Sequence, residues 1–196
     1  MKPVLIMASL FSFLSGFFSL GAAAQGYKVA ETYTGLRNMV LKTKPEAVGL
    51  KPAAGEVWGI LMETGYPEAV VSLVALADGT VSIYFSNGGG IIGLGPHPGP
   101  QRAAKALIAY AQQYSKHGVK TEKHPLPNPS YTRFYFLTGS GVTFVEAKEN
   151  DLGNGQHEMS PLFHKGHELI SEIRAVDEKL RAEQGAPGDA PKAARP

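Results

Sequence analysis

Apolar side chains recur at helical spacing in three segments of this chain. In residues 31–42 they follow an i, i+3, i+7 pattern that stops before Pro45, and residues 101–116 carry a second stripe of this kind. A third stripe begins at Ser160 and Pro161, which suit the N-cap and the first turn of a helix. The pattern therefore predicts three amphipathic helices.

Other segments show the two-residue period or the unbroken apolar run of a strand. Residues 80–86 alternate between apolar and polar, whereas residues 69–77 are almost continuously apolar, as in a strand covered on both faces. Asp78-Gly79 between them is a strong hairpin signal, and so short a turn allows only antiparallel pairing. We predict strands at residues 57–64, 69–77, 80–86, 131–137 and 142–147.

The predicted elements follow one another in the order α-β-β-β-α-β-β-α. Strands that come in runs, without a helix after each one, are typical of an α+β fold in which helices pack on an antiparallel sheet. We predict a five-stranded antiparallel sheet of this kind. In element order the chain is similar to the profilin-like group of small sheets, which includes roadblock and longin domains, and this resemblance implies the architecture alone.

The two ends of the chain differ from this central region. Met1-Lys2-Pro3, an uncharged apolar run at residues 4–20 and small residues up to Ala24 have the three-part layout of a secretory signal peptide. An uncleaved membrane anchor is the alternative, because the run approaches the length of a spanning helix. Residues 185–196 lack apolar periodicity, which predicts a disordered tail.

These features predict where the chain works and how it is divided. We expect cleavage after Ala24, a single domain at residues 25–184, and a periplasmic or secreted protein. Such a protein would touch a membrane only through its N-terminal segment, and only if that segment is retained.

Composition narrows the classes of function. The 196 residues are 43% hydrophobic and 18% charged, with a net charge of +2 and no cysteine. This balance gives no electrostatic reason to expect nucleic acid as a partner. Without cysteine, the chain forms no disulfide, thiolate metal site or thiol nucleophile.

A glycine-rich loop at residues 87–99 follows the third predicted strand. Gly88 to Gly93 satisfies the spacing G-x-G-x-x-G, but the next predicted helix starts too late for its N-terminus to hold a phosphate. No acidic residue stands about 20 positions further on to bind a ribose, so the sequence predicts no cofactor. We interpret the glycines as positions of positive φ or close backbone approach, and contact with a ligand or partner is the alternative.

Side chains beside this loop form the predicted binding surface. If the three consecutive strands pair, the aromatic residues at their ends gather next to the glycines, although ordinary decoration of the sheet is an alternative interpretation. The predicted ligand- or partner-binding residues are Tyr66, Tyr84, Asn87, Gly88, Gly89, Gly90, Gly93 and His97.

Three histidines are candidate metal ligands. His164 and His167 are three residues apart and can share one helix face, and His157 precedes them. Imidazoles in such an arrangement could bind zinc or copper. The spacing H-E-x-x-H is absent, however, and Gly166 weakens the helix between the pair, so exposed histidines at a helix start are the simpler interpretation.

Recognisable catalytic motifs are missing from the sequence. Neither G-x-S-x-G nor S-x-x-K occurs, and we interpret Glu63, Glu68 and Glu146 as solvated charges at sheet edges. The sequence favours a non-catalytic domain that binds an unknown protein of a bacterial cell envelope, or a small ligand. A hydrolase with an unrecognised acid–base pair and a histidine-based metal-binding protein are the two alternatives.

Overall fold

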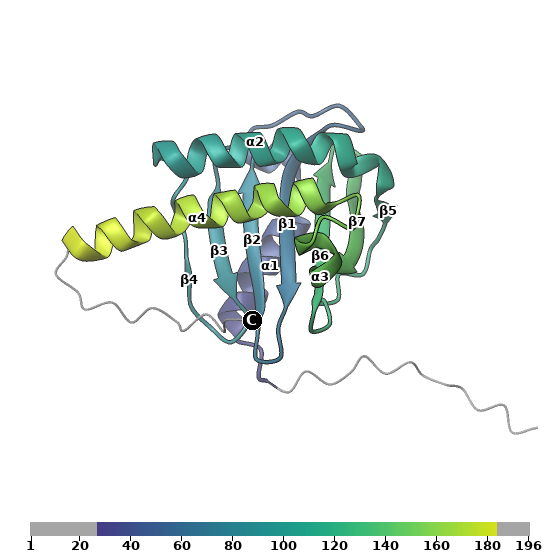
Figure 1. The fold of residues 1–196 in the computed structure, drawn as a ribbon. Helices are drawn as coiled ribbons and strands as arrows, with labels where there is room; N and C mark the ends of the chain where they lie inside the picture. Colours follow the sequence, from purple (N-terminus) through teal and green to yellow (C-terminus); the bar gives the residue numbers. More distant parts are fainter. Residues whose placement is uncertain (1–26, 184–196) are drawn as a thin grey trace, which may run out of the picture.

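Residues 27–183 fold into an antiparallel sheet with helices on both faces (Figure 1). They are the part of the chain that the computed structural model describes, and the predicted signal peptide and tail lie outside it. The elements are α1 (Glu31–Lys42), a 3-10 turn (Pro45–Val48), β1 (Val57–Gly65), β2 (Val70–Leu76), β3 (Val81–Phe85), β4 (Gly90–Ile91), α2 (Pro98–Tyr114), a 3-10 turn (Ser115–His117), β5 (Val119–Lys120), β6 (Tyr131–Thr138), β7 (Gly141–Lys148), α3 (Glu149–Gly153) and α4 (Ser160–Glu183).

The predicted α+β fold with an antiparallel sheet is confirmed. The strands lie in the order β4-β3-β2-β1-β6-β7-β5, so that β1 joins the two predicted groups of strands into one sheet. The turn between β2 and β3 forms as expected, with Gly79 at a φ of +97° and the side chain of Asp78 accepting a hydrogen bond from the Thr80 N–H.

The predicted number of strands is wrong, because the sheet has seven strands and not five. The two additional strands, β4 and β5, contain two residues each and form the two edges of the sheet. β4 lies in the predicted glycine loop, and β5 follows the second 3-10 turn, outside every predicted element. Two residues are too few to show a period, so only pairing with β3 and β7 defines these strands.

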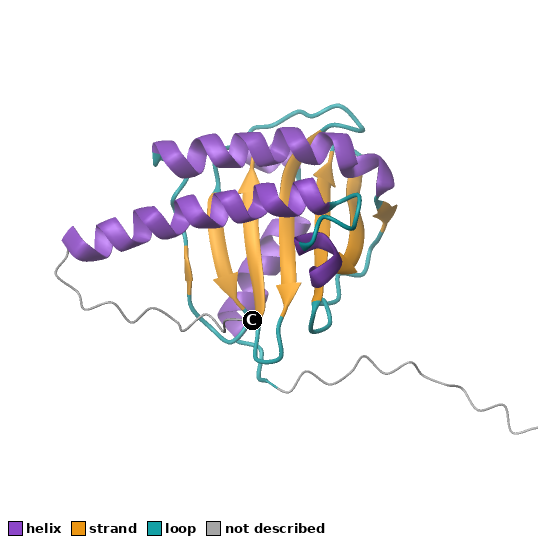
Figure 2. Ribbon diagram, in the orientation of Figure 1, coloured by secondary structure: helices purple, strands orange, loops and turns teal. Residues whose placement is uncertain are grey.

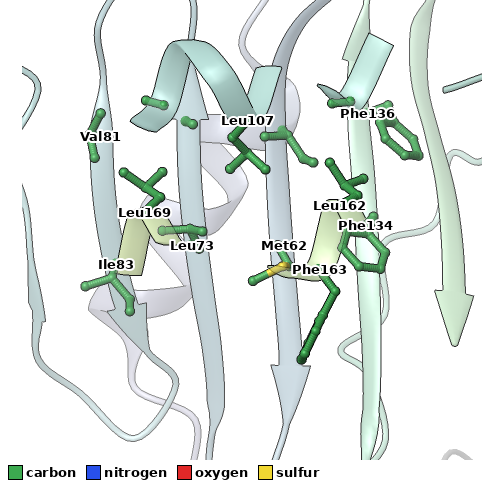
Figure 3. Close-up of a cluster of buried hydrophobic side chains, with 14 of the residues drawn as sticks. Met62, Leu73, Val81, Ile83, Leu107, Phe134, Phe136, Leu162, Phe163 and Leu169 are labelled. Atoms are coloured by element: carbon green, nitrogen blue, oxygen red, sulfur yellow. The ribbon is translucent and has the colours of Figure 1, made fainter. Parts of the chain in front are cut away.

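The larger core lies between the sheet and the layer formed by α2 and α4 (Figure 2). Figure 3 shows how side chains of the sheet meet those of the two helices, with Leu107 of α2 and Leu169 of α4 fully buried. A smaller core on the opposite face packs Tyr33, Val40 and Leu41 of α1 against the sheet. The sheet is therefore covered on both faces, as the apolar run of β2 predicted.

Gly166 allows α4 to approach the sheet closely. A Cβ atom at this position would lie 2.6 Å from the Sδ atom of Met62 on β1 and 3.6 Å from a methyl group of Leu73 on β2. The glycine that weakens the helix in isolation thus serves the packing of α4. Within residues 27–183, no helix has the length and apolar character needed to cross a membrane.

Candidate functional site

A buried ion pair ties α1 to the centre of the sheet. Two nitrogens of the Arg37 guanidinium donate hydrogen bonds to the two carboxylate oxygens of Glu63 on β1, at 2.8 and 2.7 Å. Glu63 is 0% exposed, and it also accepts hydrogen bonds from the hydroxyls of Ser72 (2.8 Å) and Tyr33 (3.3 Å). The interpretation of Glu63 as a solvated edge charge is therefore wrong.

The segment before β6 covers this ion pair through its backbone carbonyls. Arg37 donates a hydrogen bond to the carbonyl of His124 at 2.8 Å, while Arg133 and Tyr135 of β6 donate to that of Pro125 at 2.6 and 2.9 Å. Arg133 also pairs with Glu146 of β7, which is partly buried. Each charge thus faces an opposite charge or a carbonyl, as buried charges must.

Protonation in this cluster follows from burial and from these contacts. Burial, together with the charge of Glu63, raises the pKa of Tyr33, so the phenol stays neutral and can donate. Burial alone would lower the pKa of Arg37, but the hydrogen bonds and charge of Glu63 raise it above its ordinary value. The Tyr33 phenol therefore stays neutral and the Arg37 guanidinium stays charged, and Glu63 is too deeply buried to meet a substrate. We assign the cluster a structural role.

The glycine loop is defined by its backbone, as its composition predicted. Gly88, Gly89, Gly90 and Gly93 all have positive φ, between +77° and +151°. A Cβ atom on Gly90 would lie 2.5 Å from the carbonyl oxygen of Ile83, so only glycine lets the chain run this close to β3. Because α2 begins at Pro98, Gly93 does not open a helix, and the loop lacks the geometry of a phosphate cradle.

The predicted binding residues separate into an exposed group and a buried one. Asn87, Gly89, Gly90 and Gly93 are exposed, and Gly88 is partly exposed. Tyr84, in contrast, is only 4% exposed and lies in the core under α1.

The remaining two residues lie at other contacts. Tyr66 donates a hydrogen bond to Glu149 at 3.0 Å, and so it turns toward α3. His97 occupies the N-cap position of α2, although its side chain makes no capping hydrogen bond. The exposed part of the predicted binding surface is thus the glycine loop, which includes β4.

An exposed apolar residue on this surface escaped the sequence analysis. Ile92, directly after β4, is 63% exposed, and only Met39 and Val119 are comparable large apolar residues within the described part of the chain. The run from Gly79 to Gln101 contains no Asp, Glu, Lys or Arg, which is the signal that could have identified this edge.

The three candidate metal ligands make other contacts. The Nδ1 atom of His157 accepts a hydrogen bond from the backbone N–H of Met159 at 3.1 Å, just before α4. His164 is exposed, and the ring of His167 packs on that of Phe163 with centroids 4.4 Å apart. Within residues 27–183, no group of three or more His, Asp or Glu side chains is placed to hold a metal ion, so this prediction gains no support.

The described surface includes two shallow hollows beside α2. One, of about 430 Å3 between α2 and α4, contains the carboxylates Glu168 and Glu172, but it is open to solvent and Glu168 already accepts a hydrogen bond from Lys165 at 2.6 Å. The other, of about 310 Å3, is lined by Lys116 and by neutral residues, without a carboxylate. Neither hollow encloses the acid–base pair that the hydrolase alternative requires.

Comparisons do not extend this picture. The chain matches no protein-family model, no curated protein and no solved structure. Within residues 27–183, the edge at β4 combines an exposed large apolar residue with the absence of charged side chains, whereas Val119 lies beside Lys120.

Proposed function

We propose that this chain is an exported, non-catalytic interaction domain of a bacterial cell envelope, and that it binds a protein partner through its β4 edge. We define the β4 edge as residues 87–93, which include the glycine loop, β4 and Ile92. The observation that carries the proposal is the 63% exposure of Ile92 on an edge without any charged residue.

The physical argument rests on how proteins normally protect sheet edges. Charged side chains, proline or a covering segment usually prevent an edge from pairing with another chain. The β5 edge follows this rule, since Lys120 lies in the strand and Glu122 and Lys123 follow it. The β4 edge lacks such charges and exposes an isoleucine, which favours contact with another protein.

Photo-crosslinking tests this proposal directly. We would replace Ile92 with the photoreactive residue p-benzoylphenylalanine, produce the full chain in the cells it comes from, irradiate them, and identify linked proteins by mass spectrometry. The matched control carries the same residue in place of Met39, which is 65% exposed on α1. We expect a defined protein adduct from position 92 and none from position 39. Equal adducts from both positions, or none from position 92, would refute the proposal.

A further inference from the structure

Within residues 27–183, β4 pairs with β3 along one edge and with no strand along the other. Ile83 lies opposite Ile91 and Tyr84 lies opposite Gly90, while the N–H of Phe85 donates a hydrogen bond to the carbonyl of Gly89 at 3.2 Å. In an antiparallel ladder, residues alternate between bonding their neighbour strand and pointing away from it. The backbone N–H and carbonyl of Gly90 therefore point away from β3, as do those of Ile92.

Helix α4 extends beyond this edge. It crosses the strands at a steep angle and passes β4 with its C-terminal part (Figures 1 and 2). Strands are about 4.8 Å apart and a helix rises about 1.5 Å per residue, so α4 gains one strand position about every three residues. Counted from Gly166, which lies over β1 and β2, the helix is above β4 near residues 173–176. Leu180 therefore lies past the last strand.

We call residues 174–183 of α4 the overhang. The apolar stripe of the helix continues onto it. Its members are spaced alternately by four and three residues, which keeps them on one helix face. Beyond Ile173, which is fully buried, Val176 and Leu180 are only partly buried. The stripe consists of Leu162, Gly166, Leu169, Ile173, Val176 and Leu180. Both residues pack against the core, and one more strand beside β4 would lie beneath Leu180.

We infer that a second copy of this chain supplies that strand, so that two β4 strands pair antiparallel about a twofold axis perpendicular to the sheet. This inference rests on the proposed function and names the partner. With Ile91 at the axis, Gly90 lies opposite Ile92 of the second copy, and the outward backbone groups of both residues are satisfied. Ile91, which packs against the core on the α4 side, meets Ile91 of the second copy.

The charge and the side chains of β4 and α4 favour a second copy of this chain at the strand position beside β4. The vacant position requires an uncharged strand with an apolar residue facing α4, and β4 itself is such a strand. The overhang carries equal numbers of cations and anions, so two copies meet without net repulsion. These charged residues are Arg174, Lys179 and Arg181, and Asp177, Glu178 and Glu183.

The size of the contact sets the expected affinity. A strand pair with two outward residues in each copy falls short of the roughly 1,200 Å2 that a stable interface buries. The overhangs of both copies add apolar area above the paired strands, so we expect a weak dimer with a dissociation constant on the order of micromolar.

Disulfide trapping tests the predicted register, because the chain has no cysteine of its own. Residues opposite each other without mutual hydrogen bonds have Cα atoms about 4.5 Å apart, within disulfide range. In the full chain, Ile91→Cys should form disulfide dimers at least ten-fold faster under diamide than Met39→Cys or Val119→Cys. Equal rates for the three variants would overturn the inference.

Sedimentation of the unmodified full chain provides a second, independent measurement. We expect conversion from monomer to dimer in the micromolar range, and a dissociation constant raised at least ten-fold by Leu180→Lys, with an unchanged far-ultraviolet circular dichroism spectrum. A chain that stays monomeric at all concentrations overturns the inference, as does a dimer that is insensitive to this substitution. If the chain is monomeric while position 92 links to a different protein, the inference fails but the proposed function stands.

Discussion

Replacing Glu63 by glutamine tests whether the buried ion pair holds α1 on the sheet. The amide preserves the size of the side chain but removes its charge, and its NH2 group cannot accept a hydrogen bond from Arg37. The guanidinium would then remain buried beside the sheet without an anionic partner, and its close acceptors would be the amide oxygen of the new glutamine and the His124 carbonyl. The perturbation is therefore an uncompensated buried charge, and not a cavity.

The magnitude follows from the burial of the pair. Removing one partner of a fully buried ion pair costs about 3–5 kcal/mol, a large share of the roughly 5–15 kcal/mol that stabilises a domain. With an m value of about 2 kcal/mol per molar urea, the midpoint of unfolding should fall by about 2 M. Replacing both partners, as in Arg37→Met with Glu63→Leu, should destabilise less than Glu63→Gln alone, because no unpaired charge remains.

Fluorescence during urea unfolding provides the assay. The single tryptophan, Trp58, is 4% exposed and lies in the core under α1, so its emission reports on the face that the ion pair secures. The matched control is Glu168→Gln, the same chemical change in an exposed pair with Lys165, which should cost about 0.5 kcal/mol or less. A loss for Glu63→Gln as small as that of the control would refute the reasoning.

Three further predictions concern single positions. Gly90→Ala should lower the free energy of unfolding by about 1–3 kcal/mol, and by more than Gly89→Ala, because a Cβ at residue 90 meets a carbonyl of β3 whereas residue 89 faces open space. Gly35→Ala, exposed on α1 with nothing nearby, should raise the thermal midpoint through a gain of about 0.5–1 kcal/mol, whereas Gly166→Ala should give no such gain because its Cβ meets a methionine of β1. Burial, together with the neighbouring side chains of His164 and Arg174, lowers the pKa of His167, so at mildly acidic pH the unfolded chain binds a proton more readily than the folded chain does. Stability should therefore fall as pH drops below about 6.5, the unfolded value, and His167→Leu should reduce this fall between pH 7 and 5 in urea titrations; an unchanged pH dependence would count against it.

Local pattern was sufficient to predict most of the elements. The stripe in residues 31–42 matches α1, whose buried residues share one face, and the alternation in residues 80–86 matches β3, although both faces of that strand are buried. The interpretation of the glycine loop was also confirmed at Gly90, since positive φ and close backbone approach are local requirements of glycine.

The same patterns did not predict that charged residues inside apolar segments are buried. Glu63 stands near the end of the run that predicted a strand at residues 57–64, and Arg37 lies on the buried face of α1, where the sequence analysis did not single it out. Each charge would be too costly to bury alone, and only the fold brings the two together. A charged residue within an apolar stripe was the available signal, but its partner, 26 residues away, was not visible in the pattern.

The sequence by itself thus determined the type of each longer element and the faces that these elements bury. Tertiary structure decided the strand order, the presence of β4 and β5, the pairing of Arg37 with Glu63, and the extension of α4 beyond the sheet. The physical reason is the range of the interactions. Helical and strand periods depend on neighbours a few residues apart, whereas edges, buried ion pairs and overhangs arise from contacts between segments that only the folded chain brings together.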